Sequence, residues 1–179
     1  MVIALAGRRI DAPGADTPRF PVTNVAAVRA RIRVLLMERA AQAIVCAAAC
    51  GVDLLALETA EELGMRRRIV LPYTRGRFRE TSVVDRPGDW GERFDAIIDA
   101  AELSGDLSML GYAEGDDTTY LATNTAILEQ ATMLAEQLHN TAGAAVVWDG
   151  VARGEDDVTA AFLREAQQRG FPVWQIATL

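Results

Sequence analysis

The segment from residue 43 to residue 72 constrains the fold more than any other part of the chain. Its sequence, AIVCAAACGVDLLALETAEELGMRRRIVLP, reads as an apolar strand, a turn of small residues, an apolar helix that stops at Gly64, and a second strand closed by Pro72. This order predicts a βαβ unit with parallel strands. Small residues in the first crossover would let backbone amides at the helix start approach an anion, which the helix dipole favours. The crossover is therefore a candidate site for a phosphate or a nucleotide.

The rest of the chain repeats the alternation of strand and helix. Short apolar runs predict further strands at 2–6, 144–148 and 173–177, and periodic apolar positions predict helices near 25–36, 94–101, 118–139 and 158–166. We expect the segments on either side of the short helix near 94–101 to be irregular. The pattern predicts an α/β fold, a Rossmann-like doubly wound sheet of about five mainly parallel strands with helices on both faces. We expect residues 1–179 to form a single domain.

The amino-acid composition limits the kinds of molecule that the chain is expected to bind. The chain has 25 acidic and 18 basic side chains and a formal net charge of -7, which opposes nonspecific attraction to nucleic acid or to an anionic membrane. No apolar run approaches the roughly 20 residues that span a bilayer, and the N-terminus becomes charged too early for a secretory signal. Two cysteines supply neither a disulfide framework nor a zinc site. We expect a cytoplasmic protein without a metal, a cofactor or a membrane partner.

Residues just after the strands are the first candidates for a site, because ligands of open parallel sheets bind beyond the carboxyl ends of the strands. The first two strands are followed by Gly7, Arg8, Arg9, Cys50, Gly51 and Asp53. Two adjacent arginines could bind a phosphate or a carboxylate through their forked guanidinium groups. The alternative is that one of them pairs with a nearby acid.

Cys50 lies where a helix N-terminus could lower the pKa of its thiol and make it a nucleophile. The sequence offers no histidine as a catalytic partner for Cys50, because the one histidine of the chain, His139, lies at the far end of a long predicted helix. A small packing residue is the favoured interpretation of Cys50.

The segment YTRGRFRETSVVDRPGD crowds arginines after the third strand and indicates an anion-binding lid, with a solvated charged loop as the alternative. Its candidates are Ser82, Asp85 and Arg86. Proline followed by glycine after Arg86 fits a type II turn, which would hold Asp85 and Arg86 at a defined corner.

The long helix near 118–139 precedes a parallel strand, so its N-terminus must lie at the ligand edge. Tyr120 and Asn124 begin its inward apolar stripe. Tyr120 could stack on a base or hold a ribose, and Asn124 could form hydrogen bonds with a base or sugar. The alternative is that protein groups satisfy both side chains.

The fourth predicted strand is followed by Asp149, Gly150, Gly154 and Asp157. Helix capping explains Asp157 without a ligand, and a carboxylate that holds a ribose diol is the functional interpretation. The chain contains neither G-x-G-x-x-G nor G-x-x-x-x-G-K-[ST], so neither ordinary dinucleotide binding nor P-loop hydrolysis has support.

Taken together, the stretches AGRRIDAPG, AACGVDLLALETAEELG, RIVLP, SVVDRPGDW, VVWDG and EDDVT, with Tyr120 and Asn124, resemble the SLOG superfamily of Rossmann-like domains. This superfamily includes the cytokinin-activating LOG enzymes, the DNA-processing protein DprA and sensor domains of bacterial defence systems. The resemblance spans nearly the whole chain. It implies recognition of a nucleotide or nucleotide-derived ligand through the positions Gly7, Arg8, Cys50, Gly51, Asp53, Asp149 and Gly150.

One departure from the family decides between functions. LOG-type phosphoribohydrolases carry P-G-G-x-G-T-x-x-E after the fourth strand, and this chain reads WDGVARGEDDVTAAF there. Binding or sensing of a nucleotide-derived ligand, in signalling or defence, is therefore our first interpretation. The alternative is an N-glycosidase whose carboxylate is Asp157, Glu155 or Glu58. Net charge and an aromatic content of 6% argue against DprA-like binding of single-stranded DNA, and self-association or an effector domain remains open.

Overall fold

The computed structural model describes residues 1–113, 117–154 and 156–179. These residues form one six-stranded sheet with the order β4-β3-β2-β1-β5-β6, in which all neighbouring strands are parallel. The strands are β1 (Val2–Gly7), β2 (Ala43–Cys46), β3 (Arg66–Leu71), β4 (Leu107–Met109), β5 (Ala142–Trp148) and β6 (Val173–Ala177). The predicted Rossmann-like α/β architecture is confirmed, with six strands in place of about five.

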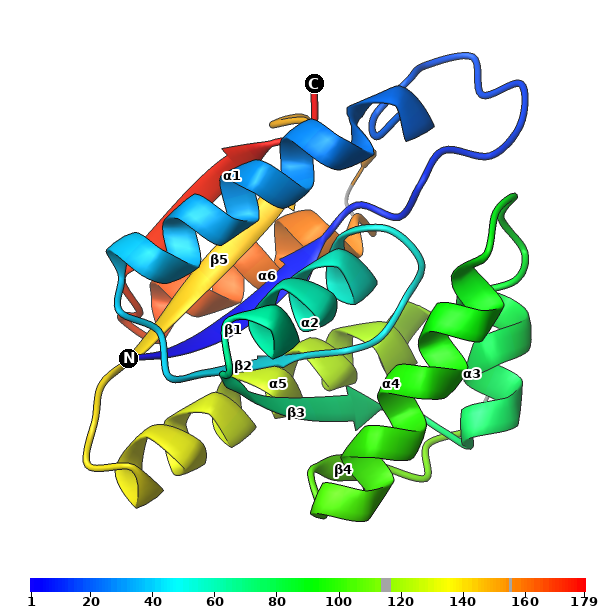
Figure 1. Ribbon diagram of the computed structural model, residues 1–179. Helices are drawn as coiled ribbons and strands as arrows, with labels where there is room; N and C mark the ends of the chain where they lie inside the picture. The colour runs from blue at the N-terminus through cyan, green and yellow to red at the C-terminus, as the bar shows by residue number, and fades with distance from the viewer. Residues whose placement is uncertain (114–116, 155) are drawn as a thin grey trace.

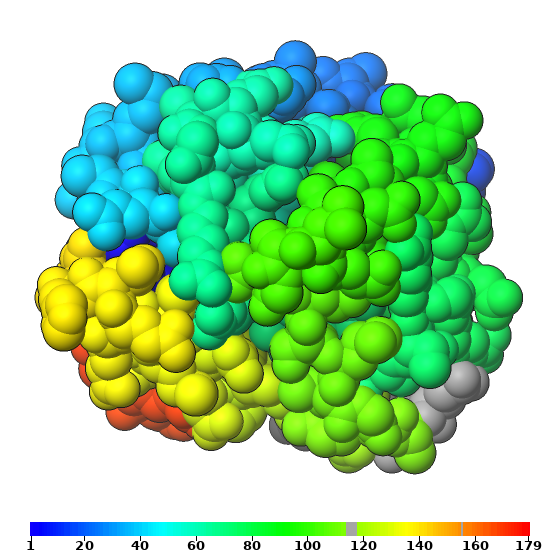
Figure 2. All heavy atoms as spheres, turned by 60° about the horizontal axis from the view of Figure 1, so that its bottom comes forward, coloured from blue at the N-terminus to red at the C-terminus, as the bar shows by residue number. Residues whose placement is uncertain are grey.

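Helices cover both faces of the sheet (Figure 1). One face carries α1 (Val25–Glu38), α2 (Val52–Glu62), α3 (Arg75–Ser82) and α4 (Trp90–Ser104), and the other carries α5 (Asp117–Gln137) and α6 (Val158–Gln168). A short 3-10 helix, η1 (Val22–Asn24), precedes α1. In the space-filling view of Figure 2, α4 lies directly against α2. No helix in the described ranges is both long and apolar enough to cross a membrane.

The central strand shows why its sequence is apolar without alternation. Ile3 and Leu5 of β1 belong to the hydrophobic cluster beneath α1, α2 and α4, whereas Val2 and Ala4 belong to the cluster beneath α5 and α6. All four side chains are fully buried. A parallel strand covered on both faces has no solvent side, so both residue parities must be apolar.

Two elements that the sequence analysis left irregular are regular in the structure. Helix α3 occupies part of the predicted charged loop, although only Phe78 and Ser82 of its eight residues are buried. Two of its arginines pair with acids of α4, with Arg75 2.6 Å from Asp99 and Arg79 3.0 Å from Asp95. The short strand β4 forms the sheet edge. Hydrophobic periodicity does not predict either element, because neither has a regular apolar face. Helix α3 is held by ion pairs, and β4 is held by pairing at the sheet edge.

The order of the strands in the sheet determines where a ligand site can lie. The chain adds β2, β3 and β4 on one side of β1 and then returns through α5 to add β5 and β6 on the other side. The loops after β1 and β5 therefore diverge toward opposite faces of the sheet, α1 lying on one face and α6 on the other. Such a topological switch point leaves a crevice at the carboxyl ends of the strands.

Candidate functional site

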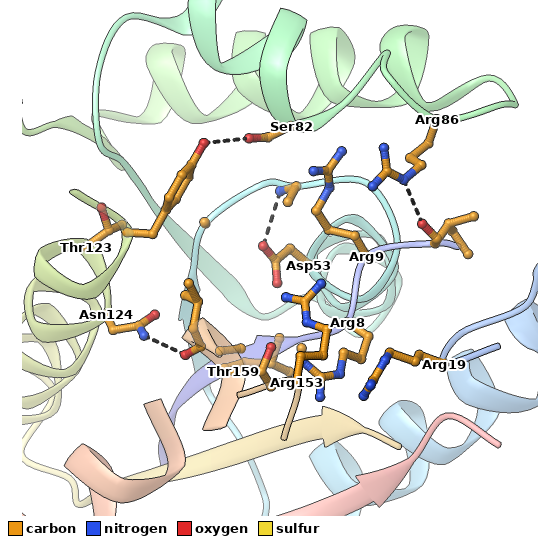
Figure 3. Close-up of a pocket in the computed structure, with 18 of the residues that line it drawn as sticks. Arg8, Arg9, Arg19, Asp53, Ser82, Arg86, Thr123, Asn124, Arg153 and Thr159 are labelled. Atoms are coloured by element: carbon orange, nitrogen blue, oxygen red, sulfur yellow. Dashed lines mark hydrogen bonds between the residues drawn. The ribbon is translucent and has the colours of Figure 1, made fainter. Parts of the chain in front are cut away.

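A cavity of about 470 Å³ opens at this switch point (Figure 3). Its volume falls inside the range of roughly 300–1,000 Å³ that is typical of small-molecule sites. Its wall comes from the end of β1 and the following loop, the starts of α2, α5 and α6, and α3. Of the residues predicted from the sequence, those that line it are Gly7, Arg8, Arg9, Asp53, Ser82, Arg86, Tyr120 and Asn124. Those that do not line it are Cys50, Gly51, Asp85, Asp149, Gly150, Gly154 and Asp157.

Arg8, Asp149 and Asp157 form what we call the buried cluster. The Nε atom of Arg8 donates to Oδ1 of Asp149 at 2.7 Å, and its Nη1 donates to both carboxylate oxygens of Asp157 at 2.8 Å. Nη2 donates to the carbonyl oxygen of Val151 at 2.6 Å. Arg8 thus joins the loops after β1 and β5, and a ligand would meet a guanidinium whose charge is already balanced.

Asp157 is the N-cap of α6. Its carboxylate accepts the amides of Thr159 and Ala160, and that of Arg153 as well. Burial alone would raise the pKa of Asp157, but the backbone hydrogen bonds and the guanidinium of Arg8 lower it below its ordinary value of 3.8. The capping interpretation therefore accounts for Asp157, with a buried arginine as its counter-ion.

Arg9, Asp85 and Arg86 form what we call the rim cluster. Arg9 pairs with Asp85, and both side chains are 31% exposed. Arg86 donates from Nη1 to Asp85 at 2.6 Å and from Nε to the carbonyl of Ile10 at 3.0 Å. In the described part of the chain, Nη1 of Arg9 and Nη2 of Arg86 have no hydrogen-bond partner. The rim cluster therefore keeps donors for a ligand.

The glycines after β1 and β2 serve backbone packing. Gly51 has a φ of 98°, and a Cβ there would lie 2.7 Å from the amide nitrogen of Ile10 and 2.9 Å from the carbonyl oxygen of Arg8. A Cβ on Gly7 would lie 2.4 Å from Val52. The amide of Val52 donates to the carbonyl of Arg8 at 3.2 Å. The close approach that Gly51 permits is thus that of the β1 loop. Ala47 and Ala49 of the same crossover line the cavity, so an anion beside them stays a prediction.

Cys50 is fully buried, and burial raises the pKa of its thiol although the nearby Arg9 guanidinium opposes the shift. Its amide donates to the carbonyl of Ser82 at 3.0 Å. These features fit the packing role and disfavour a thiolate nucleophile. Gly150 and Gly154 have φ values of 80° and 134°, so they provide turns between β5 and α6.

Asp53 stands in the first turn of α2 and is the most perturbed carboxyl group of the cavity. It is 8% exposed, and its Oδ2 accepts the amide of Ala49 at 3.1 Å. Burial raises the pKa of Asp53 to about 7, against the lowering effects of the Ala49 hydrogen bond and of the Arg9 charge. A carboxyl group with this pKa in a cavity is a candidate functional group.

Tyr120 and Asn124 line the cavity and also contact protein groups. The hydroxyl of Tyr120 lies 2.8 Å from that of Tyr73 and 3.5 Å from that of Ser82. Nδ2 of Asn124 donates to the carbonyl of Val158 at 2.9 Å. Protein groups therefore bind a polar atom of each side chain at the cavity wall, and contact of these side chains with a base or a sugar stays a prediction.

Two further arginines line the cavity that the sequence analysis did not select, Arg19 and Arg153. The carboxylate of Asp11 accepts the amides of Arg19 and Phe20 at 3.0–3.1 Å, which closes the long loop after β1. Nη1 of Arg19 then reaches Asp149 at 2.7 Å. The length of this loop in the sequence is a feature typical of functional loops. The residues around Arg19 contain no sequence pattern that predicts the return of the loop to the site.

Comparison with known proteins supports the fold. No protein-family model matches the sequence, and no curated protein matches it. Among solved structures, the DNA processing protein A (DprA) from Streptococcus pneumoniae superposes with a TM-score of 0.56 at 16% sequence identity, over 97% of this chain and 49% of the DprA chain. This chain thus spans about half the length of that neighbour. The printed role of this neighbour, DNA processing, does not fit our argument against nucleic acid as a partner. The chain therefore shares its fold with about half of the DprA chain.

Proposed function

We propose that this chain binds a nucleotide or nucleotide-derived ligand in the cavity at the switch point and acts as a sensor of that ligand in signalling or defence. The observation that carries the proposal is the concentration of arginines in one cavity of an acidic protein. Five arginines line it, namely Arg8, Arg9, Arg19, Arg86 and Arg153, whereas the whole chain has a net charge of -7.

The lining favours a phosphate at the rim cluster. Asp11 and Asp53 are the acids among the described residues that line the cavity, and the carboxylate of Asp11 accepts backbone amides. Guanidinium groups with unused N–H donors bind phosphate oxygens in a charge-assisted geometry. An anion therefore gains more at Arg9 and Arg86 than at the saturated Arg8.

A nucleotide suits the cavity better than a long single strand. Strand-binding grooves combine a basic track with exposed aromatic rings on which successive bases stack. The aromatic side chains of the lining are Phe78, which is 2% exposed, and Tyr120, whose hydroxyl contacts Tyr73. The likeness to DprA nevertheless makes an oligonucleotide a required arm of the test.

An N-glycosidase is a second candidate, and Asp53 is the observation in its favour. The carboxylates first considered have other partners or lie elsewhere: Asp157 caps α6, Glu58 pairs with Arg93 at 2.6 Å, and Glu155 lies outside the described residues. A carboxyl group with a pKa of about 7 can donate a proton to a departing base near neutral pH. Release of free base would separate this activity from binding.

The proposal is tested by calorimetric titration and thermal shift with pyrophosphate, nucleoside mono-, di- and triphosphates, cyclic nucleotides, NAD, ADP-ribose and a single-stranded oligonucleotide. A ligand at about a hundred times its Kd adds about 2.7 kcal/mol to the free energy of unfolding. We expect at least one small phosphate compound to bind and the double variant Arg9→Gln/Arg86→Gln to weaken it about tenfold or more.

The matched control is Arg39→Gln, which removes one positive charge just after α1, outside the cavity. It should leave affinity unchanged. Each hit is also incubated and checked by chromatography for released base, and base release lost in Asp53→Asn would establish the glycosidase. Absence of binding by every small phosphate compound, or a preference for the oligonucleotide alone, would contradict the proposal.

A partner for the sensor remains a prediction of the resemblance. A second copy of this chain and a separate effector domain are both compatible with a site at one edge of the sheet. Light-scattering mass with and without a bound ligand tests the first of these directly.

A further inference from the structure

The cavity has two chemically different ends. The rim cluster supplies positive charge at one end, whereas the wall toward α5 carries uncharged polar side chains, Asn124 among them, together with Asp53. Figure 3 shows Asp53 between the arginines and Asn124. Both side chains are more than nine-tenths buried, at 8% and 5% exposed. A ligand with its phosphate on the arginines would therefore present its next group to Asp53.

Asn124 offers an acceptor to the cavity. A backbone carbonyl can only accept, so the contact with Val158 at 2.9 Å fixes Nδ2 as the donating atom of the amide and leaves Oδ1 as the other polar atom. No group of the described chain donates to Oδ1. The orientation of this amide thus follows from its partner.

Asp53 offers an acceptor of the same kind. Its Oδ2 accepts the amide of Ala49 at 3.1 Å, and within the described residues Oδ1 has no donor. In the described chain neither oxygen is among the fully buried polar atoms that lack a partner, so both are accessible from the cavity. Two accessible acceptors in one cavity can receive hydrogen bonds from donors that a ligand supplies.

We propose that Asp53 and Asn124 bind the sugar hydroxyls of the ligand, so that the cavity selects ribonucleotides over nucleotides whose sugar lacks the 2′- and 3′-hydroxyls. The ribose of a nucleotide carries two adjacent hydroxyl donors and is bonded to the 5′-phosphate. A carboxylate oxygen and an amide oxygen that line the same cavity can accept hydrogen bonds from these hydroxyls. This inference rests on the proposed nucleotide binding and adds the chemical class of its ligand. It also separates this site from one that recognises DNA.

The test compares each of the four ribonucleoside 5′-monophosphates with its 2′,3′-dideoxy counterpart, and with pyrophosphate as the phosphate-only probe. Titrations are made at pH 8, where Asp53 is ionised and therefore accepts only. We expect at least one ribonucleotide to bind about 10- to 100-fold more tightly than its dideoxy counterpart, as hydrogen bonds to a charged group imply.

The decisive variant is Asp53→Asn, which is isosteric and removes a buried charge, so folding is preserved. It should bring the ribo-to-dideoxy ratio close to one while pyrophosphate binds as in the wild type or more tightly. The control Asp99→Asn makes the same change on the exposed side of α4 and should keep the ratio.

The outcomes separate the two proposals. Equal binding of ribo and dideoxy forms by the wild type, or an unchanged ratio in Asp53→Asn, overturns the ribose inference while phosphate binding stands. Failure of pyrophosphate and of every nucleotide to bind overturns the proposed function and this inference with it.

Discussion

The buried cluster and the rim cluster contain the same residue types and begin at adjacent positions of the chain, but they differ in solvent exposure. Arg8 is 3% exposed between two aspartates that are themselves buried, whereas Arg9 and Asp85 are each 31% exposed. Desolvated charges must be fully paired, and half-exposed charges can exchange a partner for a ligand at little cost. The charged side chains at the strand ends therefore differ in role: those of the buried cluster join two loops, and those of the rim cluster are available to a ligand.

The largest effect should come from breaking the buried cluster. Arg8→Ala leaves Asp149 and Asp157 without their shared counter-ion, and we expect the free energy of unfolding to fall by about 3–5 kcal/mol. Arg9→Ala in the rim cluster should lower it by about 1 kcal/mol or less. Urea denaturation of both variants at pH 7 measures the contrast, and equal losses would show that burial does not separate the clusters.

Asp53 belongs to neither cluster, and its substitution should have the opposite of the usual effect on stability. Its pKa in the folded protein is about 7 against 3.8 as the ordinary value, so its favourable contribution is complete below about pH 4 and is lost as the pH rises through 7. Asp53→Asn should therefore be more stable than the wild type above pH 7, by up to about 4 kcal/mol. Urea denaturation at pH 5 and pH 8 checks this, and parallel pH profiles of the two proteins would refute it.

Asp157 should show the opposite pH dependence with a smaller effect. Its pKa is lowered in the folded protein, so its contribution is present above 3.8 and is lost as the pH falls below that value. Asp157→Asn keeps an N-cap oxygen but loses the charge opposite Arg8, which should cost about 1–3 kcal/mol at pH 7. The difference from the wild type should shrink at pH 3. A rim variant, Asp85→Asn, should change stability by less than about 1 kcal/mol at either pH.

The sequence predicted those parts of the fold whose stability comes from apolar burial. The β2–α2–β3 unit is present, and Gly64 has the left-handed φ of 68° expected where a helix stops. The structure adds β4 and α3, which lack an apolar stripe and depend on neighbours for pairing. Hydrophobic periodicity in the sequence indicates which residues are buried. It does not predict an element that is held by ion pairs or by pairing at a sheet edge.

Prediction of the site was less complete for a similar reason. Residues that closely follow strands, such as Arg9 and Asp53, were found because the topology brings all strand ends to one edge. Arg19 and Arg153 were missed because they reach the cavity only through the closure of long loops. The role of Gly51 was not predicted either, since no local pattern shows that the β1 loop occupies the space beside it.

The sequence by itself determined that parallel strands covered on both faces would carry arginines and aspartates at their carboxyl ends, because hydrophobic periodicity and chain order require no tertiary information. Only the tertiary structure decided which of those charges are buried and paired. Arg8 meets Asp149 and Asp157 across 141 and 149 positions of the chain, while Arg9 meets Asp85 across 76. Burial and charge pairing arise from contacts between distant segments, and it is these contacts that leave the donors of Arg9 and the acceptor oxygens of Asp53 and Asn124 to the cavity.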